Sequence, residues 1–325
     1  MPLYLVTGGA GFIGSHLVHA LVRRGDRVRV VDDLVTGRRS NLDGLEVGGV
    51  GTGAPVEFLR GNVTDARVCH AACEAVDGVF HEAAQVSVPR SVADPEASYE
   101  VNVMGTLRLL EAARRLEVPR FVFAASSAAY GDSDELPKHE DMLPKPLSPY
   151  ASGKVAGEHL LRVFGETYGL RTVSLRYFNV FGPRQADDSP YTGVIAIFAR
   201  ALLAGRPITI HGDGKQTRDF TYVDNVVDAN LRAMERKLPA GVVINVGAGE
   251  RISLSELHRA MADSPGVKST PAHGPAREGD VRHSLASLDR ARELLGYEPR
   301  VTWRDGLART MDWYRADRGV RPPAR

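Results

Sequence analysis

A glycine-rich run directly after the first apolar segment is the feature that most limits what this chain can fold into. Residues 3–7 read as a strand, and they lead into Gly8-Gly9-Ala10-Gly11-Phe12-Ile13-Gly14. Glycines at these spacings let the backbone turn tightly and approach a pyrophosphate, and the helix that follows directs its N–H groups at that anion. The run therefore predicts a strand, a turn and a helix that bind a dinucleotide, with contacts from Gly8, Gly11, Phe12, Ile13 and Gly14.

A carboxylate at the end of the second predicted strand indicates which dinucleotide binds. Asp32 lies 18 residues beyond Gly14, close to the interval of about 20 residues that is typical of this arrangement. Its carboxylate would accept a hydrogen bond from an adenosine ribose hydroxyl and would repel a 2′-phosphate. Arg38 and Arg39 could instead meet a 2′-phosphate, but we expect them on a solvated loop farther away. The sequence therefore predicts NAD rather than NADP.

The rhythm of apolar runs predicts an α/β fold. Strand-like runs at 3–7, 27–31, 56–59, 77–81, 120–125 and 171–176 alternate with helical stretches at 14–24, 66–75, 96–116 and 150–168. Strands separated by helices of this length favour right-handed βαβ units. We therefore expect a Rossmann-type, doubly wound parallel sheet.

The second half of the chain has a different rhythm. From position 179 loops and turns dominate, and a buried strand at 242–246 could rejoin the main sheet. We expect an NAD-binding domain at 1–178 with a returning segment at about 220–247. A smaller, discontinuous α+β substrate-binding domain would comprise 179–219 and 248–325.

Charge and composition argue against other classes of partner. The 41 basic and 40 acidic residues leave a formal net charge of +1, so no long-range field would draw the protein to nucleic acid or to a membrane. No apolar run approaches the roughly 20 residues that cross a bilayer. Cys69 and Cys73 read as reduced thiols, and the ten histidines form no ligand-spaced cluster. We expect a cytoplasmic protein without a metal.

A tyrosine and a lysine four residues apart carry the predicted chemistry. Ser148 can cap a helix and Pro149 suits its first position, which places Tyr150 and Lys154 on one helix face. A nearby ammonium favours the phenolate, so Tyr150 becomes a usable acid or base near neutral pH.

Polar and small residues at strand ends extend this site. Ser126 and Ser127 follow the strand at 120–125, where a hydroxyl can hydrogen-bond a substrate oxygen and pass its proton to the phenol. With NAD alongside, the phenolate can take the proton of a secondary alcohol while hydride leaves its carbon. Ala83, Ala84 and Gln85 follow the fourth strand at the edge where parallel sheets bind ligands. Asn62 and Val63 follow the third strand. They could border the adenine or form an ordinary turn, and the sequence favours neither interpretation.

At these residues the chain resembles the extended short-chain dehydrogenase/reductase family, and within it the nucleotide-sugar 4-epimerases. The resemblance covers almost the whole chain and includes the glycine run, Asn102, Ser126, Tyr150, Lys154 and the segments 176–179, 212–214 and 217–220. It implies that NAD stays bound, takes hydride from C4 of a UDP-sugar and returns it to the other face of a 4-keto intermediate. It also implies a homodimer joined through a four-helix bundle of the helices at 96–116 and 150–168.

The resemblance also implies further ligand contacts. Asn102, Tyr150, Lys154 and Tyr177 would contact the cofactor, with Lys154 on the nicotinamide ribose. Substrate contacts would come from Ser87, Ser126, Ser127, Tyr150, Asn179, Gln185, Val194, Arg218, Arg277, Asp280 and Ser284. Among these, Arg218 and Arg277 would meet the two phosphates, because guanidinium suits planar, bidentate anion contacts.

One position bears on the identity of the sugar. By resemblance, Ser284 is a gate beside the C2 substituent, where a bulky aromatic would exclude an N-acetyl group and a serine leaves space. The segments 179–185 and 191–195 also resemble epimerases that act on UDP-N-acetylglucosamine, with Ser87 and Gln185 placed to bond the amide. We therefore expect UDP-N-acetylglucosamine as the favoured substrate and UDP-glucose as a second one.

Rival activities differ in a few side chains. A 4,6-dehydratase carries Asp-Glu where this chain has Ser127 and Ala128, and a UDP-glucuronate decarboxylase usually has glutamate at the position of Ala128. A UDP-glucuronate 4-epimerase stays open, since Arg184, Arg282 or His283 could face a carboxylate. A plain dehydrogenase would consume added NAD at every turnover. A non-enzymatic NAD-binding sensor would typically lack the catalytic tyrosine or lysine, and both are present.

Overall fold

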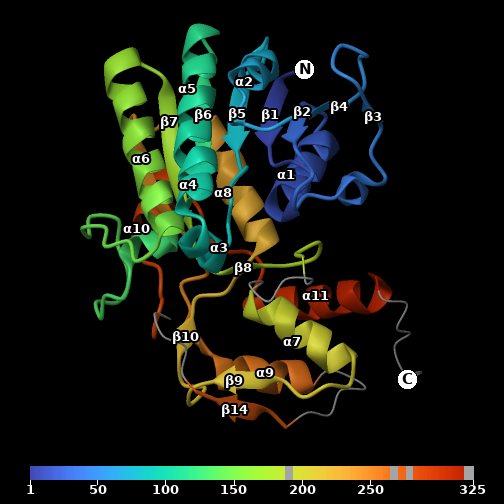
Figure 1. Cartoon of the computed structure of the whole chain (residues 1–325), viewed down its shortest axis with the longest axis vertical. Coiled ribbons are helices and arrows are strands. Elements are labelled where there is room, and N and C mark those ends of the chain that lie inside the picture. Colours follow the sequence, from blue (N-terminus) through green and yellow to red (C-terminus); the bar gives the residue numbers. More distant parts are fainter. Residues whose placement is uncertain (187–192, 264–269, 276–280, 318–325) are drawn as a thin grey trace.

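The computed structural model describes residues 1–186, 193–263, 270–275 and 281–317. Eight parallel strands form one sheet in the order β12-β7-β6-β5-β1-β2-β4-β3 (Figure 1). The strands are β1 (Leu3–Thr7), β2 (Arg27–Asp32), β3 (Val47–Gly48), β4 (Val56–Arg60), β5 (Gly78–His81), β6 (Arg120–Ser126), β7 (Arg171–Tyr177) and β12 (Val242–Val246). The predicted Rossmann-type parallel sheet is confirmed, and the order of its strands reverses between β1 and β5.

Helices cover both faces of the sheet. One face carries α1 (Phe12–Arg23), α8 (Val223–Glu235) and α10 (Asp289–Leu295), and the other carries α2 (Ala66–Cys73), α5 (Thr106–Arg115) and α6 (Pro149–Tyr168). On the first face Leu17 and Val226 pack with Val30, and on the second Leu109 packs with Phe121. Burial on both faces explains why the strands read as short continuous apolar runs.

The stretch 96–116, predicted as one helix, is divided in the structure. The helices α3 (Val88–Ala93) and α4 (Pro95–Tyr99) precede a π-helical turn at Glu100–Gly105, and α5 follows. This wider turn directs Asn102 inward, and the residue is only 2% exposed. A Cβ built at Gly153 would lie 3.2 Å from the Cβ of Asn102. A π turn of this kind often occurs at functional sites, and here it brings a polar amide to the edge of the sheet.

A smaller group of elements lies below the sheet in Figure 1. It contains α7 (Val194–Leu203), α9 (Leu254–Ala262), α11 (Trp303–Asp317) and the short pairs β8 (Val180–Phe181) with β11 (Thr221–Tyr222), β9 (Thr209–His211) with β14 (Ala272–Gly274), and β10 (Thr217–Arg218) with β13 (Ile252–Ser253). These elements share a hydrophobic cluster of their own around Phe198, Leu257 and Met311. The sequence did not predict α8, β13 or β14, and the exact domain limits stay a prediction.

None of the helices in the described part of the chain is long and apolar enough to cross a membrane. Cys69 and Cys73 are buried and unpaired with one another. Burial raises the pKa of both thiols, to about 11 and about 12. Neither thiol therefore has the character of a reactive cysteine. The cytoplasmic location stays a prediction.

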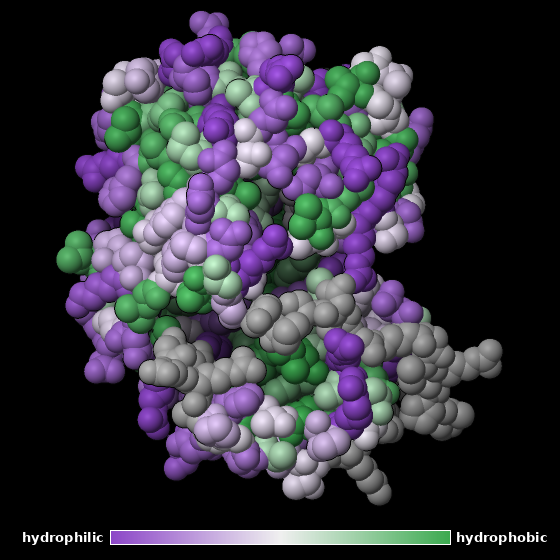
Figure 2. Space-filling view, viewed as in Figure 1, coloured by the Kyte–Doolittle hydropathy of each residue, from purple (hydrophilic) through white to green (hydrophobic). Residues whose placement is uncertain are grey.

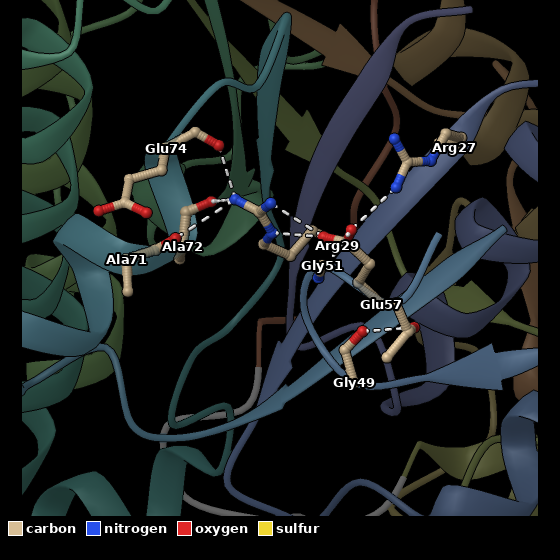
Figure 3. A network of polar contacts seen from close by, with 9 residues as sticks. Arg27, Arg29, Gly49, Gly51, Glu57, Ala71, Ala72 and Glu74 are labelled. Atoms are coloured by element: carbon tan, nitrogen blue, oxygen red, sulfur yellow. Dashed lines mark hydrogen bonds and ion pairs between the residues drawn. The ribbon is translucent and has the colours of Figure 1, made fainter. Parts of the chain in front are cut away.

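A buried ion network ties the edge of the sheet to α2 (Figure 3). Arg29 and Glu57, 6% and 2% exposed, are joined by two contacts of 2.9 Å. Arg27 also donates to Glu57, at 2.8 Å. The Nη1 of Arg29 donates to the carbonyl oxygens of Ala71, Ala72 and Glu74 at 3.3, 3.1 and 2.7 Å. One guanidinium thus satisfies a buried carboxylate and the open carbonyl end of a helix at the same time.

Candidate active site

The glycine turn between β1 and α1 leaves room for backbone only. A Cβ at Gly14 would lie 2.2 Å from the carbonyl oxygen of Gly8. Gly8 itself has φ +67°, and a Cβ there would lie 2.9 Å from the backbone of Ala83. Among the described residues no side chain caps α1, and its first turn holds no acidic residue. The turn therefore presents backbone N–H groups and a positive helix end, which fits a pyrophosphate.

Asp32 stands beside this turn at the end of β2. Its carboxylate accepts hydrogen bonds from the backbone N–H groups of Ala10 and Leu34, both at 2.9 Å. Burial raises the pKa of Asp32, and these N–H groups counteract the rise. Each carboxylate oxygen keeps accepting capacity for a ribose hydroxyl. The side chains of Arg38 and Arg39 are exposed, and Arg39 lies 5.0 Å from the centre of the Phe58 ring. The donor and acceptor set thus fits the adenosine half of NAD.

Asn102 holds the loop after β5 in place. Its Oδ1 accepts from the backbone N–H of Gln85 at 2.9 Å, and its Nδ2 donates to the carbonyl of Gln85 at 3.0 Å. The N–H of Ala83 donates to the hydroxyl of Thr7 at 3.2 Å. These bonds fix the loop Ala83–Gln85 at the carboxyl edge of the sheet, next to the glycine turn.

The loop after β4 forms a local turn. Asn62 accepts from the N–H of Thr64 at 2.9 Å and donates to Asp33 at 2.8 Å. Val63 is 4% exposed and packs against the π-helical turn at Gly105. Both residues therefore have structural roles, and their contact with the cofactor stays a prediction.

The structure brings Ser126, Tyr150 and Lys154 together. Ser148 caps α6 by accepting from the N–H of Ala151 at 3.2 Å, with proline at the first helical position, as predicted. Tyr150 and Lys154 follow on one face of this helix. The hydroxyl of Ser126, at the end of β6, lies close enough to the Tyr150 phenol to lower its pKa. The three predicted catalytic residues thus lie together at the carboxyl edge of the sheet, and their roles in the chemistry stay a prediction.

Burial governs the pKa values of this group. Lys154 is 3% exposed and donates its Nζ to the carbonyl of Ala124 at 2.6 Å. Burial lowers its pKa to about 8, and the carboxylates of Glu82 and Glu158 counteract the fall. Burial raises the pKa of Tyr150, and the Ser126 hydroxyl opposes the rise. We expected Lys154 to dominate the pKa of the phenol. Burial is instead the largest influence on that pKa, and the Lys154 ammonium donates to the backbone carbonyl of Ala124.

A cavity of about 250 Å³ lies in the smaller part of the molecule, and it contains four predicted substrate residues. Its lining consists of Asn179, Val180, Phe181, Gln185, Gly193, Val194, Ile195, Ile197, Phe198, Thr209, His211, Gln216, Arg218, Phe220 and Leu254. Hydrophobic residues gather in a hollow of the surface below the sheet, near the level of α7 (Figure 2). The Oε1 of Gln185 is buried and has no hydrogen-bond partner among the described residues. A mostly apolar cavity with a few polar groups is the usual form of a small-molecule site.

The other predicted substrate residues are not among those that line this cavity, and two of them lie outside the described part of the chain. Ser284 is 9% exposed, and its hydroxyl accepts from the Nδ2 of Asn179 at 3.1 Å. Ser87 caps α3 by accepting from the N–H of Arg90, and Ser127 begins the short 3₁₀ helix after β6. Arg277 and Asp280 lie outside the described residues. Substrate contacts for all of these stay predictions.

Sequence reasoning missed three buried or half-buried polar groups beneath the site. His81 is fully buried and contacts the hydroxyls of Thr7 and Thr106 at 2.7 and 3.0 Å. Glu158 and Arg176 form a buried, bidentate ion pair at 2.8 and 2.7 Å. Glu82 accepts the hydroxyl of Tyr177 at 2.8 Å. The one available signal was the spacing of Glu158, which lies four residues beyond Lys154 and therefore on the same helix face.

Comparison with known proteins shows which family the chain belongs to. The model of the family described as "NAD dependent epimerase/dehydratase family" matches residues 4–247. The chain belongs to this family. The predicted resemblance to nucleotide-sugar 4-epimerases, the assignment to the isomerases and the cofactor NAD are thereby confirmed.

Individual relatives of this epimerase/dehydratase differ in the sugars that their names give. A UDP-glucose 4-epimerase of Mycolicibacterium smegmatis is 44% identical over 313 residues, 96% of this chain and 98% of the relative. The structure of a UDP-glucose 4-epimerase of Thermotoga maritima with UDP-glucose has a TM-score of 0.90 at 38% identity, covering 97% of this chain and 99% of that chain. A UDP-N-acetylglucosamine 4-epimerase of Methanobrevibacter ruminantium, in complex with UDP-N-acetylmuramic acid, has a TM-score of 0.90 at 35% identity with the same coverage. A variant UDP-glucuronic acid 4-epimerase of Bacillus cereus, with NAD and a fluorinated UDP-glucuronic acid, has a TM-score of 0.88 at 33% identity, again with that coverage.

Proposed function

We propose that this epimerase interconverts UDP-N-acetylglucosamine and UDP-N-acetylgalactosamine, and that it accepts UDP-glucose and UDP-galactose as a second pair. The observation that carries the proposal is the cavity that joins Asn179, Gln185, Val194 and Arg218. The buried Oε1 of Gln185 offers an acceptor to a donor such as the amide N–H of an N-acetyl group. The side chain of Ser284 is small and hydrogen-bonded to Asn179. This supports the prediction that the site has space beside the C2 substituent.

Ser126, Tyr150 and Lys154, the proposed catalytic group, would each have a separate role in the reaction. Tyr150 would take the proton from the C4 hydroxyl, and Ser126 would hydrogen-bond that oxygen during the transfer. NAD supplies the two-electron acceptor when it is bound. Lys154 would hold the nicotinamide ribose, and its charge would favour the phenolate. Arg218, a lining residue of the cavity, would bind phosphate oxygens of the substrate.

UDP-glucuronate is the alternative substrate that the test must include. The Nη1 of Arg184 donates to the carbonyl of Asn41 at 2.9 Å, and the side chain of Arg282 is exposed near Asp213, at 3.5 Å. The Nδ1 of His283 contacts the hydroxyl of Thr217 at 2.9 Å. All three candidate partners for a sugar carboxylate thus have contacts elsewhere, which favours the uncharged sugars.

A direct assay separates these substrates. We expect the purified protein, without added NAD, to convert UDP-N-acetylglucosamine to a stable mixture with UDP-N-acetylgalactosamine. Chromatography of the nucleotide sugars measures the conversion, with UDP-glucose and UDP-glucuronate in parallel reactions. Conversion of UDP-glucuronate alone, by a preparation that is shown to contain NAD, would overturn the N-acetyl assignment.

We also propose a homodimer joined through α5 and α6, as the resemblance implies. Hydrophobic side chains are exposed on this side of the molecule: Val92 at 63%, Tyr99 at 39%, Met104 at 37%, Val163 at 52% and Tyr168 at 54%. They belong to α3, α4, the π-helical turn and α6, and exposed apolar side chains that gather on one side would mark an interaction site. We expect light scattering to give a mass near twice that of the 35.2 kDa chain. A monomeric mass at micromolar concentration would contradict the dimer.

A further inference from the structure

Glu82 is a carboxylate beside the catalytic group to which the proposed chemistry assigns no task. It follows directly after β5, and its Oε1 accepts the hydroxyl of Tyr177 at 2.8 Å. The same hydroxyl accepts from the Nδ2 of Asn230 at 2.7 Å. A tyrosine hydroxyl has one proton to give, so these two contacts leave it a single arrangement. Side chains from β5, β7 and α8 thereby fix one another.

The Glu82 group and Lys154 approach the same strand ends from opposite faces of the sheet. Asn230 belongs to α8, whose residues pack in the cluster on one face, and Lys154 belongs to α6, which packs in the cluster on the other. Between them runs β6, whose Ala124 accepts the Lys154 Nζ and whose Ser126 lies opposite Tyr177 in the register of β6 and β7. The charges of Glu82 and Lys154 act on each other here, and each favours the ionised form of the other.

Glu82 is the carboxylate that most favours the charged form of Lys154, and the other titratable groups near this lysine are paired or neutral. Glu158 is bound to Arg176 in a bidentate pair. Burial, together with the charge of Lys154, lowers the pKa of His81 to about 3, so His81 is neutral. Burial raises the pKa of the Tyr177 phenol well above its ordinary value, with the carboxylate of Glu82 adding to the rise, so this phenol is neutral too. Burial raises the pKa of Tyr150, four residues before Lys154, so this phenol supplies no counter-charge to the ammonium.

We propose that Glu82 is a positioning residue that fixes the Tyr177 ring and keeps Lys154 protonated on the alkaline side of neutrality. Burial lowers the pKa of Lys154 to about 8 and raises the pKa of Glu82 to about 7. Glu82 is therefore ionised over the pH range in which the lysine begins to lose its proton. The inference rests on the proposed function, because it assigns Glu82 to the same reaction.

The substitution Glu82→Gln tests the charge without removing the contact. A glutamine amide oxygen can still accept the Tyr177 hydroxyl, but it does not stabilise an ammonium. Loss of a carboxylate lowers the pKa of a neighbouring lysine, so the alkaline limb of the kcat/KM profile should move down by about one pH unit. The acid limb should stay in place, because Glu82 is protonated there in the parent enzyme. Glu82→Asp keeps the charge and should keep the parent's alkaline limb, which separates charge from side-chain loss.

Glu140→Gln is the matched control. Glu140 is also half-buried, and it accepts the backbone N–H of Asn245 at 2.8 Å rather than facing Lys154. Its replacement removes a carboxylate from the same protein by the same chemical change. We expect both limbs of its pH profile to stay where they are in the parent enzyme.

A second readout requires no sugar turnover. Cyanoborohydride can deliver hydride to enzyme-bound NAD, and absorbance at 340 nm records the NADH that forms. A protonated Lys154 beside the cationic nicotinamide makes its reduction more favourable, so the rate should fall as the lysine deprotonates. The midpoint of this pH dependence should be lower by about one unit in Glu82→Gln than in the parent or in Glu140→Gln.

The two readouts distinguish failure of this inference from failure of the proposed function. A lower reduction midpoint in a protein that turns over none of the three sugars would refute the proposed substrate and retain Glu82 as the support of Lys154. Unchanged midpoints in both measurements, in a Glu82→Gln protein that turns over UDP-N-acetylglucosamine, would overturn the role of Glu82. So would a displaced alkaline limb in Glu82→Asp equal to that in Glu82→Gln.

Discussion

Replacement of Tyr150 by phenylalanine is expected to slow sugar turnover by about 10²–10⁴-fold, the usual contribution of a general acid/base. The substitution removes the phenolic hydroxyl, whose pKa Ser126 lowers, and leaves the ring in place. Lys154, Asp32 and the glycine turn are untouched, so bound NAD should remain. Initial rates with UDP-N-acetylglucosamine and the NAD content after denaturation measure the two effects separately.

Tyr168→Phe is the control for this variant. Tyr168 lies at the other end of the same helix and is 54% exposed. Its ring contacts Phe164 and Arg114, and phenylalanine preserves both contacts. We expect this variant to turn over the sugar substrate at the same rate as the parent enzyme. Full activity in Tyr150→Phe would show that another group moves the proton.

Replacement of Glu57 by glutamine should cost the most stability of the changes considered. The amide would leave the buried guanidinium of Arg29 without its carboxylate, and it would also weaken the contacts of Arg27 and of the Gly51 N–H with the same side chain. Removal of one partner from a buried ion pair costs about 3–5 kcal/mol. Thermal unfolding with saturating NAD should therefore show a midpoint lower by several degrees. The rate per folded enzyme should not change, because the network lies away from the catalytic group.

Glu74→Gln provides the same chemical change within the same network (Figure 3). Glu74 contributes its backbone carbonyl to Arg29, and its carboxylate is 59% exposed in a 3.8 Å contact with His70. An exposed pair of this kind contributes at most about 1 kcal/mol. Equal midpoints for the two variants would mean that solvent reaches the Glu57 site and that its charge is not buried.

Local patterns predicted the parts of the molecule that local physics determines. The glycine turn, the Asp32 carboxylate at the end of β2 and the Ser148 cap of α6 each depend on residues within about one turn or one strand. Periodicity located six of the seven sheet strands up to β7, because strands buried on both faces read as apolar runs, and it missed the two-residue β3. The family resemblance assigned distant residues such as Asn179 and Arg218 to one predicted substrate site, and both line the same cavity.

The missing parts depend on contacts between distant residues. Glu82 and Tyr177 are separated by 95 positions, and no local pattern shows that a carboxylate after β5 meets a hydroxyl at the end of β7. The side chain of Arg184 could be assigned to a sugar carboxylate from sequence alone, whereas the structure directs it to Asn41. The π-helical turn at Glu100–Gly105 also escaped prediction, since its residues continue a helical pattern and differ from it only in hydrogen bonding.

The central claim is that hydride leaves C4 and returns to C4 within one enzyme molecule, with Tyr150 moving the proton. We would incubate UDP-N-acetylglucosamine carrying deuterium at C4 with the purified protein, without added NAD, and examine the product by mass spectrometry and NMR. The predicted result is UDP-N-acetylgalactosamine with deuterium fully retained at C4, in an amount that far exceeds the bound NAD. Loss of deuterium to solvent, or product limited to one equivalent of added NAD, would contradict the mechanism.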